Sequence, residues 1–171
     1  MDLVSEVTRV PVPESADTDF GRFDYADAFE VRMDQPDGRT MAQWLRSGLE
    51  DSPAAMRALI VIVHRGVLLL RLKPSSVQDN VLGWRVTRQE SDEARLEASG
   101  PLFRGRLVGR RVDAHTVRLD TFLNFNAPTA GRAIWMLVGP LHRRVAPYLL
   151  RRAASKASGG TANPVPDRCA E

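Results

Sequence analysis

Apolar and polar residues alternate from residue 23 to residue 33, and this two-residue period is typical of a strand with one buried face. The apolar positions are Phe23, Tyr25, Phe29, Val31 and Met33. Turn-forming residues follow in DQPDG, at residues 34–38, and they predict the end of the strand. We therefore expect one strand before the first helical segment.

Helical spacing replaces this alternation after the turn. Thr40 and Gln43 have the spacing of a capping box, which predicts a first helix over residues 41–50. Ser52, which precedes a proline, predicts the N-cap of a second helix that extends to about Leu72. The end of that segment, VLLLRL, also suits a strand, because periodicity alone does not assign a short apolar run.

The second half of the chain predicts a run of strands and a long helix. The strand segments are VLGWRVTRQE (residues 81–90), EARLEAS (93–99), LFRGRLVGRRV (102–112) and TVRLDTFLNFN (116–126). Their short, turn-like connections favour antiparallel hairpins, and residues 129–154 return to helical spacing. This order predicts an α+β fold in which the last helix covers one face of a curved antiparallel sheet.

The two ends of the chain differ from the middle in composition. Residues 1–19 are polar and contain Pro11 and Pro13, which predicts an extended lead-in. Residues 155–171 have the Ser, Gly and Pro content of a disordered tail. We therefore predict a single domain over residues 20–154.

Length and charge leave most function classes open. A chain of 171 residues with 43% hydrophobic residues suits one folded domain, and 24 basic against 21 acidic residues is too small an imbalance to indicate nucleic acid. The N-terminus has no signal-peptide pattern, and the longest apolar run, residues 58–63, is too short to cross a bilayer. The single Cys169 cannot form an internal disulfide. We expect a cytoplasmic protein without stable membrane insertion.

Several segments, taken in order, resemble one known family. FDYADAFEVRM, VLGWRV, LEASGPLFRGRLVGRRV with LDTFLNFN, and VGPLHRRVAPYLLRRA look like the bacterial Domain of Unknown Function 2867, over roughly residues 20–154. The order of elements also resembles the helix-grip fold of the START, polyketide-cyclase and plant pathogenesis-related superfamily (SRPBCC). Members of that superfamily hold apolar ligands, or catalyse cyclisation or hydrolysis, in a cavity between the sheet and the long helix. The resemblance implies this fold and transfers no catalytic residues.

Motifs for several kinds of chemistry are missing. The chain contains no glycine-rich phosphate loop, HExxH, nucleophile elbow or paired-cysteine zinc pattern. These absences argue against nucleotide hydrolysis, zinc proteolysis and nicotinamide-dependent redox chemistry. We expect no metal and no cofactor.

His142 is the polar residue that interrupts the apolar arc of the C-terminal helix. It can act as a general acid or base, or bind a ligand head group, because its unperturbed pKa is near 6.5. Alternatively, a backbone carbonyl or a carboxylate satisfies it. The apolar arc comprises Ile134, Trp135, Leu137, Val138, Leu141, Val145, Tyr148 and Leu149.

Asp27 is a second polar residue on an apolar face, between Tyr25 and Phe29. A buried carboxylate is costly unless it is paired, so Asp27 is either a general base, a ligand anchor, or a residue paired with an arginine or placed at the sheet rim. In the last strand the apolar set is expected to face the core, with Thr121 as its only hydroxyl. That set is Val117, Leu119, Thr121, Leu123 and Phe125, and the opposite set is Arg118, Asp120, Phe122 and Asn124.

Arginines gather in two places. FRGRLVGRR, at residues 103–111, suits RNA binding in composition, but strand alternation favours arginines that are solvated or paired with carboxylates. Membrane-surface attachment through the arginines of the C-terminal helix is a weaker hypothesis, because an interfacial helix exposes its apolar arc and here the sheet needs that arc. We expect no nucleic-acid partner. The expected carboxylate partners are Asp92, Glu93, Glu97 and Asp120, and the helix arginines are Arg143, Arg144, Arg151 and Arg152.

These patterns lead to three hypotheses. The first is a pocket between the sheet and the last helix that binds a small hydrophobic or amphipathic ligand. The second is an enzyme that uses the same cavity, with His142 and Asp27 as acid and base. The third is an interaction module or homodimer through the apolar residues 58–70. The residues predicted to line the pocket are Tyr25, Asp27, Phe29, Trp84, Trp135 and His142.

Overall fold

The computed structural model describes residues 6–12, 19–73 and 79–157. Its strands are β1 (Val7–Val10), β2 (Tyr25–Arg32), β3 (Asn80–Val81), β4 (Trp84–Gln89), β5 (Glu93–Ser99), β6 (Phe103–Asp113) and β7 (Thr116–Phe125). Its helices are α1 (Met41–Leu49), α2 (Ala54–Val61), the π-helix η1 (Ile62–Val67) and α3 (Pro128–Ala157).

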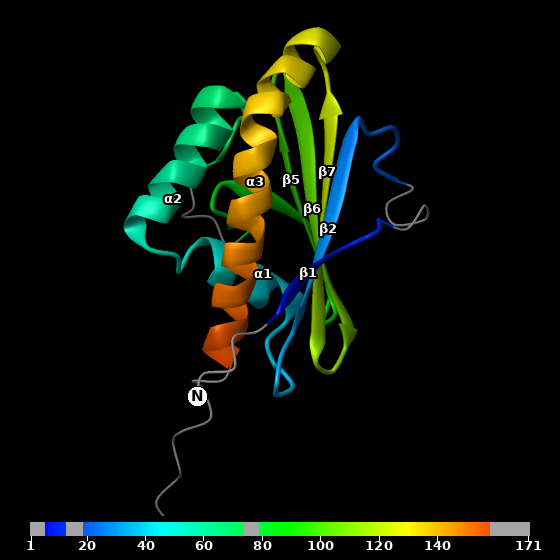
Figure 1. Cartoon of the computed structure of the whole chain (residues 1–171), viewed down its shortest axis with the longest axis vertical. Coiled ribbons are helices and arrows are strands. Elements are labelled where there is room, and N and C mark those ends of the chain that lie inside the picture. Colours follow the sequence, from blue (N-terminus) through cyan, green and yellow to red (C-terminus); the bar gives the residue numbers. More distant parts are fainter. Residues whose placement is uncertain (1–5, 13–18, 74–78, 158–171) are drawn as a thin grey trace, which may run out of the picture.

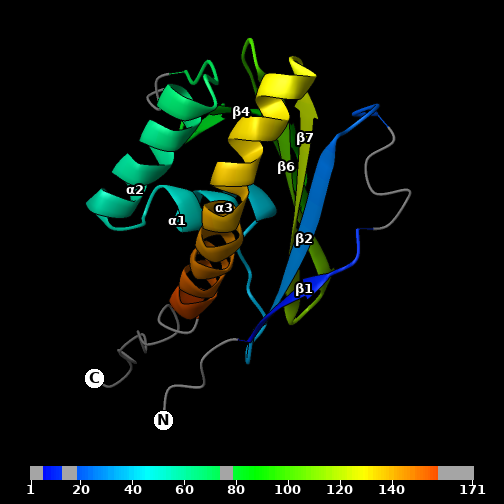
Figure 2. The same ribbon diagram turned by 45° about the horizontal axis from the view of Figure 1, so that its top comes forward.

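The strands form one antiparallel sheet with the order β1-β2-β7-β6-β5-β4-β3. The helices lie on one face of this sheet, and α3 runs along it beside α2 (Figures 1 and 2). The predicted α+β fold, with a long C-terminal helix over a curved antiparallel sheet, is therefore confirmed. This arrangement is that of a helix-grip fold.

The first helix begins as its sequence predicts. The Thr40 hydroxyl accepts a hydrogen bond from the backbone N–H of Gln43, and the Gln43 side chain accepts one from the backbone N–H of Thr40. The prediction that Ser52 caps the second helix is wrong. Its hydroxyl instead donates to the carbonyl of Gly48 over 2.6 Å, at the end of α1, so it is no longer available to α2.

The second predicted helix ends earlier than expected. It widens into η1 after Val61, and the chain has no regular structure from Leu68 to Lys73, so the alternative of a strand in VLLLRL is not realised. Leu69 has a φ of 51°, which neither helix nor strand accommodates. The next backbone N–H, that of Leu70, still donates to the carbonyl of His64 over 2.9 Å. The turn therefore remains tied to η1.

The segment VLGWRVTRQE forms a tight hairpin and not one strand. Leu82 and Gly83 have φ values of 47° and 86°, the conformation of a two-residue hairpin turn. A Cβ on Gly83 would lie 2.9 Å from the carbonyl oxygen of Lys73. The glycine thus allows both the turn and the close approach of the preceding segment.

Each end of the chain extends further than the composition indicated. Residues 7–10 of the expected lead-in form β1, which pairs with β2. Helix α3 continues through both of its prolines to Ala157, three residues into the expected tail. The rest of that tail, with Cys169, lies outside the described residues.

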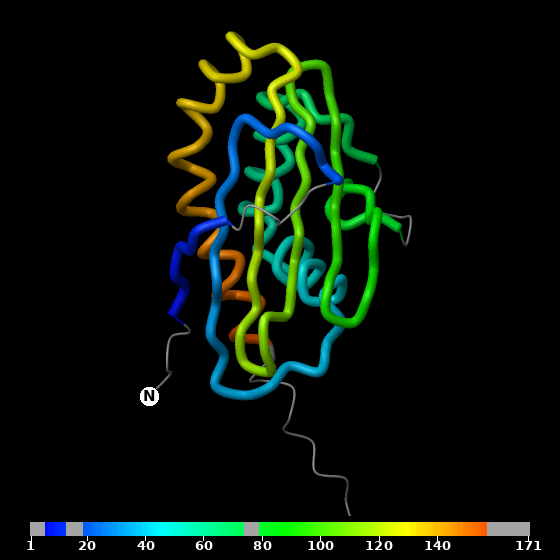
Figure 3. Tube along the Cα trace, turned by 90° about the vertical axis from the view of Figure 1, so that its right-hand side faces the viewer, coloured from blue at the N-terminus to red at the C-terminus, as the bar shows by residue number. Residues whose placement is uncertain are grey.

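Both faces of the sheet are covered. The inner face packs against the helices and contains the larger apolar core, with the predicted set of β7 facing it. On the outer face Phe20, Val108 and Phe122 form a second, smaller cluster. The segment before β2 supplies Phe20 and crosses this face (Figure 3).

Candidate functional site

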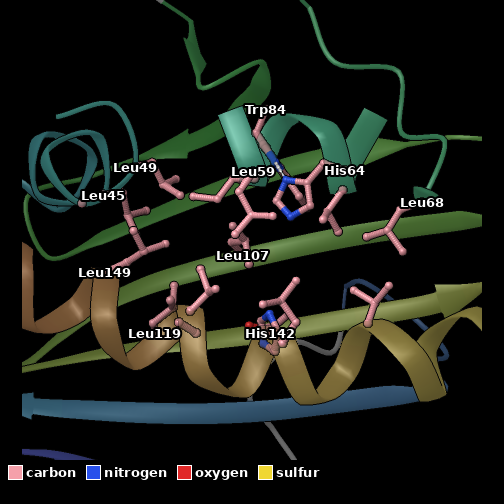
Figure 4. A pocket seen from close by; sticks show the side chains of 18 of the residues that line it. Leu45, Leu49, Leu59, His64, Leu68, Trp84, Leu107, Leu119, His142 and Leu149 are labelled. Carbon is pink, nitrogen blue, oxygen red and sulfur yellow. Dashed lines mark hydrogen bonds between the residues drawn. The ribbon is translucent and has the colours of Figure 1, made fainter. Parts of the chain in front are cut away.

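A cavity of about 100 Å³ lies between the inner face of the sheet and the helices (Figure 4). Its walls come from α1, from α2 with η1, from α3, and from strands β4, β6 and β7. Most of the lining is leucine, valine and tryptophan. The cavity is thus an apolar space in which few polar groups are present.

Helix α3 contributes a narrower face to the cavity than predicted. Leu137 is 81% exposed and Tyr148 is 37% exposed, so their assignment to the buried arc is wrong. The helix continues one turn further than expected and turns small residues inward near its C-terminal end, such as Ala146 and Ala153. Its contributions to the cavity include Trp135, Val138, Leu141, His142, Val145 and Leu149.

His142 is bonded to a buried carboxylate behind the cavity wall. Its Nε2 lies 3.2 Å from Oδ1 of Asp27, which is 1% exposed. The hydroxyl of Tyr25 donates to Oδ2 of the same carboxylate over 2.5 Å. The rings of Tyr25 and Trp135 also pack edge-on, with centroids 4.7 Å apart. A strand and a helix far apart in sequence thus fix one cluster.

Burial and hydrogen bonding oppose each other at this carboxylate. Burial raises the pKa of Asp27. The hydrogen bond from His142, the positive charge of that ring whenever it is protonated, and the hydrogen bonds from Tyr25 and Thr121 outweigh burial and hold the pKa below its ordinary value. Burial, and then the hydrogen bond to Asp27 and its negative charge, raise the pKa of Tyr25 to about 12. At neutral pH, therefore, Asp27 is ionised and Tyr25 keeps its proton.

This charge state determines the tautomer of His142. An ionised carboxylate only accepts hydrogen bonds, so Nε2 of His142 carries the proton that points to Asp27. In the neutral ring the lone pair is then on Nδ1. Among the described residues no hydrogen-bond partner is found for Nδ1 of His142. The residue therefore offers an acceptor or a base on the side away from Asp27.

A second histidine projects into the cavity from the opposite wall. His64 lies on η1, and its Nδ1 accepts a hydrogen bond from the indole N–H of Trp84 over 3.3 Å (Figure 4). Burial, and to a smaller extent the positive charge of His142 whenever that ring is protonated, lower the pKa of His64 to about 4. His64 is therefore neutral at neutral pH, with its proton on Nε2. Single π-helical turns inside helices occur frequently at functional sites.

Two other polar groups at the cavity, the indole N–H groups of Trp44 and Trp135, are buried without a hydrogen bond to any described residue. The hydroxyl of Thr121 is also buried at the cavity, and its hydrogen bond to Asp27 helps to lower the pKa of that carboxyl. Thr121 is paired directly opposite Asp27 in the β2–β7 ladder. Buried groups without partners are uncommon and cost stability. Their gathering around one cavity marks it as a site that is not optimised for stability alone.

Comparison with protein families found a match over residues 20–149 to the family described as Protein of unknown function (DUF2867). The chain belongs to the DUF2867 family. Comparisons with the curated proteins and with the solved structures found no match. The family boundary at residue 149 lies inside α3, so the match includes every strand from β2 to β7 and the cavity-lining residues of α3 except Leu150.

The DUF2867 domain brings five of the six predicted residues together. Trp84, Trp135 and His142 line the cavity. Asp27 and Tyr25 do not line it, but they contact His142 from behind. The sixth residue, Phe29, is buried in the apolar core and does not reach the cavity. Asp27 has no arginine partner in this cluster and is not at the sheet rim.

Sequence reasoning did not select His64, Trp44 or Thr121 as site residues of the DUF2867 domain. His64 interrupts the apolar run of the second helix as His142 interrupts that of the last helix, so the same signal was available. Trp44 lies on the first helix and belongs both to the apolar core and to the cavity wall. Thr121 was noted only as the hydroxyl of the inner face.

Arginines of the segment FRGRLVGRR, residues 103–111, form ion pairs on the outer face of the sheet. Arg106 is buried and bonded to Glu97 and Asp19, and Arg110 to Glu93 and Asp120. The expectation that these arginines pair with carboxylates is therefore confirmed. Within residues 6–12, 19–73 and 79–157, no helix has the length and apolar character needed to cross a membrane.

The apolar residues of α2 and η1 are divided between core and surface. Ile60 is buried, whereas Ile62 is 63% exposed and Val67 is 41% exposed. These exposed residues belong to the segment 58–70, through which we predicted a homodimer or another protein contact. That contact stays a prediction. The half of the segment that faces inward belongs to the cavity wall.

Proposed function

We propose that this domain binds a small hydrophobic or amphipathic molecule in the cavity between the sheet and α3. One observation carries the proposal: an apolar cavity that receives a histidine from each of two opposite walls. Apolar walls with a few convergent polar groups are the usual composition of small-molecule sites. Membership of the SRPBCC superfamily, which the helix-grip arrangement supports, is part of the same proposal.

The cavity contains its own reporter of binding. The chain has three tryptophans, and Trp44, Trp84 and Trp135 all line the cavity. Intrinsic fluorescence therefore responds to any molecule that enters. Engineered apolar cavities of about 150 Å³ bind benzene. The cavity here is smaller, at about 100 Å³, so we choose a probe with no more than a single aromatic ring.

The test is a fluorescence titration with toluene. We expect a saturable change for the native chain and for Met136→Phe, because Met136 lies on α3 but is 73% exposed. Val138→Phe fills the cavity from the same helix and is expected to abolish the change. The proposal is wrong if toluene causes no saturable change, or if Val138→Phe binds toluene as the native chain does.

A second candidate function, acid–base catalysis, is favoured by the bond between Asp27 and His142. In this hypothesis Asp27 orients the ring and stabilises its charged form, and Nδ1 of His142 removes a proton from the carbon beside a carbonyl group. The electron pair of the broken C–H bond forms the C=C bond of an enolate. The enolate oxygen accepts a hydrogen bond from Nε2–H of His64, and the imidazolium then returns the proton to carbon.

Deuterium exchange separates catalysis from binding alone. Acetophenone in D₂O would lose its methyl proton signal faster with the native chain than with His142→Gln, by about 100-fold. His115→Gln is the matched control. His115 lies at the turn between β6 and β7, where its ring is hydrogen-bonded to the carbonyl of Met33, and it does not line the cavity. Equal exchange rates for both variants and the native chain would exclude this candidate and leave the binding proposal intact.

A further inference from the structure

The two histidines of the cavity have complementary hydrogen-bonding roles. Nδ1 of His64 is occupied by the Trp84 indole, which leaves Nε2–H as a donor. Nε2–H of His142 is occupied by Asp27, which leaves Nδ1 as an acceptor. The cavity therefore has one fixed donor on the η1 wall and one fixed acceptor on the α3 wall (Figure 4).

We propose that the cavity selects ligands that carry a hydroxyl group on an apolar body. The hydroxyl oxygen accepts a hydrogen bond from Nε2–H of His64, and its proton is donated to Nδ1 of His142. A hydroxyl is the smallest group that performs both roles. This inference rests on the proposed binding function and specifies the chemical class of the ligand.

Other polar head groups match the two histidines less well. A carboxylate only accepts, so its oxygen would face the lone pair of His142 without a proton between them. An ammonium group has no acceptor for His64, and its charge would be buried among leucines and valines. An ether or ketone uses the donor of His64 and leaves His142 without a partner.

The protein environment keeps both rings in these roles. Tyr25 and His142 each donate to Asp27, so the proton of His142 cannot move to Nδ1 without breaking a bond to a buried charge. Burial keeps His64 neutral, because it lowers the pKa to about 4. The hydroxyl of Thr121 lies opposite Asp27 on the same sheet wall, and its hydrogen bond to Asp27 further stabilises the ionised carboxylate.

The direct test compares phenol, anisole and toluene on the native chain by tryptophan fluorescence. An apolar cavity without polar partners disfavours a hydroxyl by at least about tenfold relative to a methyl group. We expect phenol to bind at least as tightly as toluene, and about fivefold more tightly than anisole, which accepts but does not donate. Toluene binding tenfold more tightly than phenol would overturn the inference.

A pair of variants on η1 tests the donor separately. His64→Leu is expected to weaken phenol binding by at least fivefold and to leave toluene binding unchanged or tighter. Val67→Leu is the matched control on the exposed side of the same turn, and it should change neither affinity. Equal loss of both ligands in His64→Leu would contradict the inference.

Failure of the inference and failure of the proposed function give different results. If toluene binds and phenol is excluded, the cavity binds ligands but does not select a hydroxyl. If none of the three probes binds, the proposed function itself fails, and the inference fails with it.

Discussion

Two aspartates are buried on adjacent strands of the same sheet, and they face opposite sides of it. Asp27 on β2 is 1% exposed and points toward the helices, while Asp120 on β7 is 0% exposed and points to the outer face. They are near neighbours in the ladder, since Asp120 pairs with Ala28. Their partners, however, are of different kinds.

The outer aspartate is held by guanidinium groups. Asp120 accepts from Nε of Arg118 over 2.6 Å and from an N–H of Arg110 over 3.0 Å. Burial raises the pKa of Asp120, and the two arginines only partly offset this effect. Arginine keeps its proton under all ordinary conditions, so this cluster has no group that exchanges protons near neutral pH.

The inner aspartate is held by groups that can change their protonation. Asp27 is bonded to His142 and Tyr25, and the histidine reaches the cavity. The comparison teaches that a buried carboxylate in this sheet is not by itself a functional signal. What distinguishes Asp27 from Asp120 is the kind of side chain that binds the carboxylate, and whether that side chain reaches the cavity.

The largest expected effect comes from removing the outer carboxylate. Asp120→Ala leaves two arginines short of a buried partner, and we expect a loss of about 3 kcal/mol in the free energy of unfolding. Urea denaturation measures it, with Asp51→Ala, at an exposed carboxylate, as the control. Toluene binding by the folded fraction should be unchanged. A loss below about 1 kcal/mol would show that Asp120 is not the centre of the outer cluster.

Replacing the inner carboxylate should cost less stability and affect the cavity more. Asp27→Asn keeps the shape but removes the charge, and its amide cannot accept from both His142 and Tyr25 as well as a carboxylate does. We expect a loss of about 2 kcal/mol in the free energy of unfolding and a smaller preference for phenol over anisole. An unchanged preference would contradict the role given to Asp27.

The two aspartates should respond to acid in opposite directions. The pKa of Asp27 is lowered by folding, so its contribution to stability is present above its unfolded pKa near 3.9 and is lost as the pH falls through the folded value. The pKa of Asp120 is raised by folding, so its buried negative charge lowers the free energy of unfolding at neutral pH. This cost disappears as the pH falls through the folded pKa and the carboxylate takes up a proton.

Stability measured against pH should therefore change in opposite ways in the two asparagine variants. Relative to the native chain, Asp27→Asn should lose less stability as the pH falls below about 4. Asp120→Asn should lack the gain in stability that the native chain obtains from Asp120 as the pH falls toward about 4. Chemical denaturation at several pH values measures both slopes. Parallel profiles for the two variants would contradict the contrast between the faces.

The smallest expected effect concerns the cover of the outer face. The Phe20 ring lies 4.6 Å from the guanidinium of Arg104 and 6.1 Å from the ring of Phe122. Phe20→Leu removes these ring contacts, and we expect a loss of about 1 kcal/mol in stability with no change in toluene affinity. A weaker toluene affinity would show that the outer face influences the cavity.

Local patterns were sufficient to predict most of the fold. β5 has the predicted bounds, because its alternation and its flanking turns are local, and the Thr40–Gln43 capping box places the start of α1. The failures came where distant or competing groups decide. Ser52 bonds a carbonyl of the preceding helix, and the wide apolar arc of the last helix did not show that Leu137 faces solvent.

The candidate site was predictable in part. Asp27 and His142 each stood out as a polar residue on an apolar face, but they are 115 positions apart and no local pattern pairs them. His64 was overlooked because the run around it read as a continuous helix, whereas a π-helical turn presents it to the cavity. Contacts across the fold, and not spacing, join these residues.

The central claim is that a ligand occupies the inner cavity between His64 and His142. Side-chain nitrogen NMR tests it directly, because the chain has three histidines and His115, at the β6–β7 turn, serves as an internal control. Addition of phenol is predicted to shift the ring nitrogens of His64 and His142 in a saturable manner and to leave those of His115 in place. Saturable tryptophan quenching without a shift of either cavity histidine would contradict the claim.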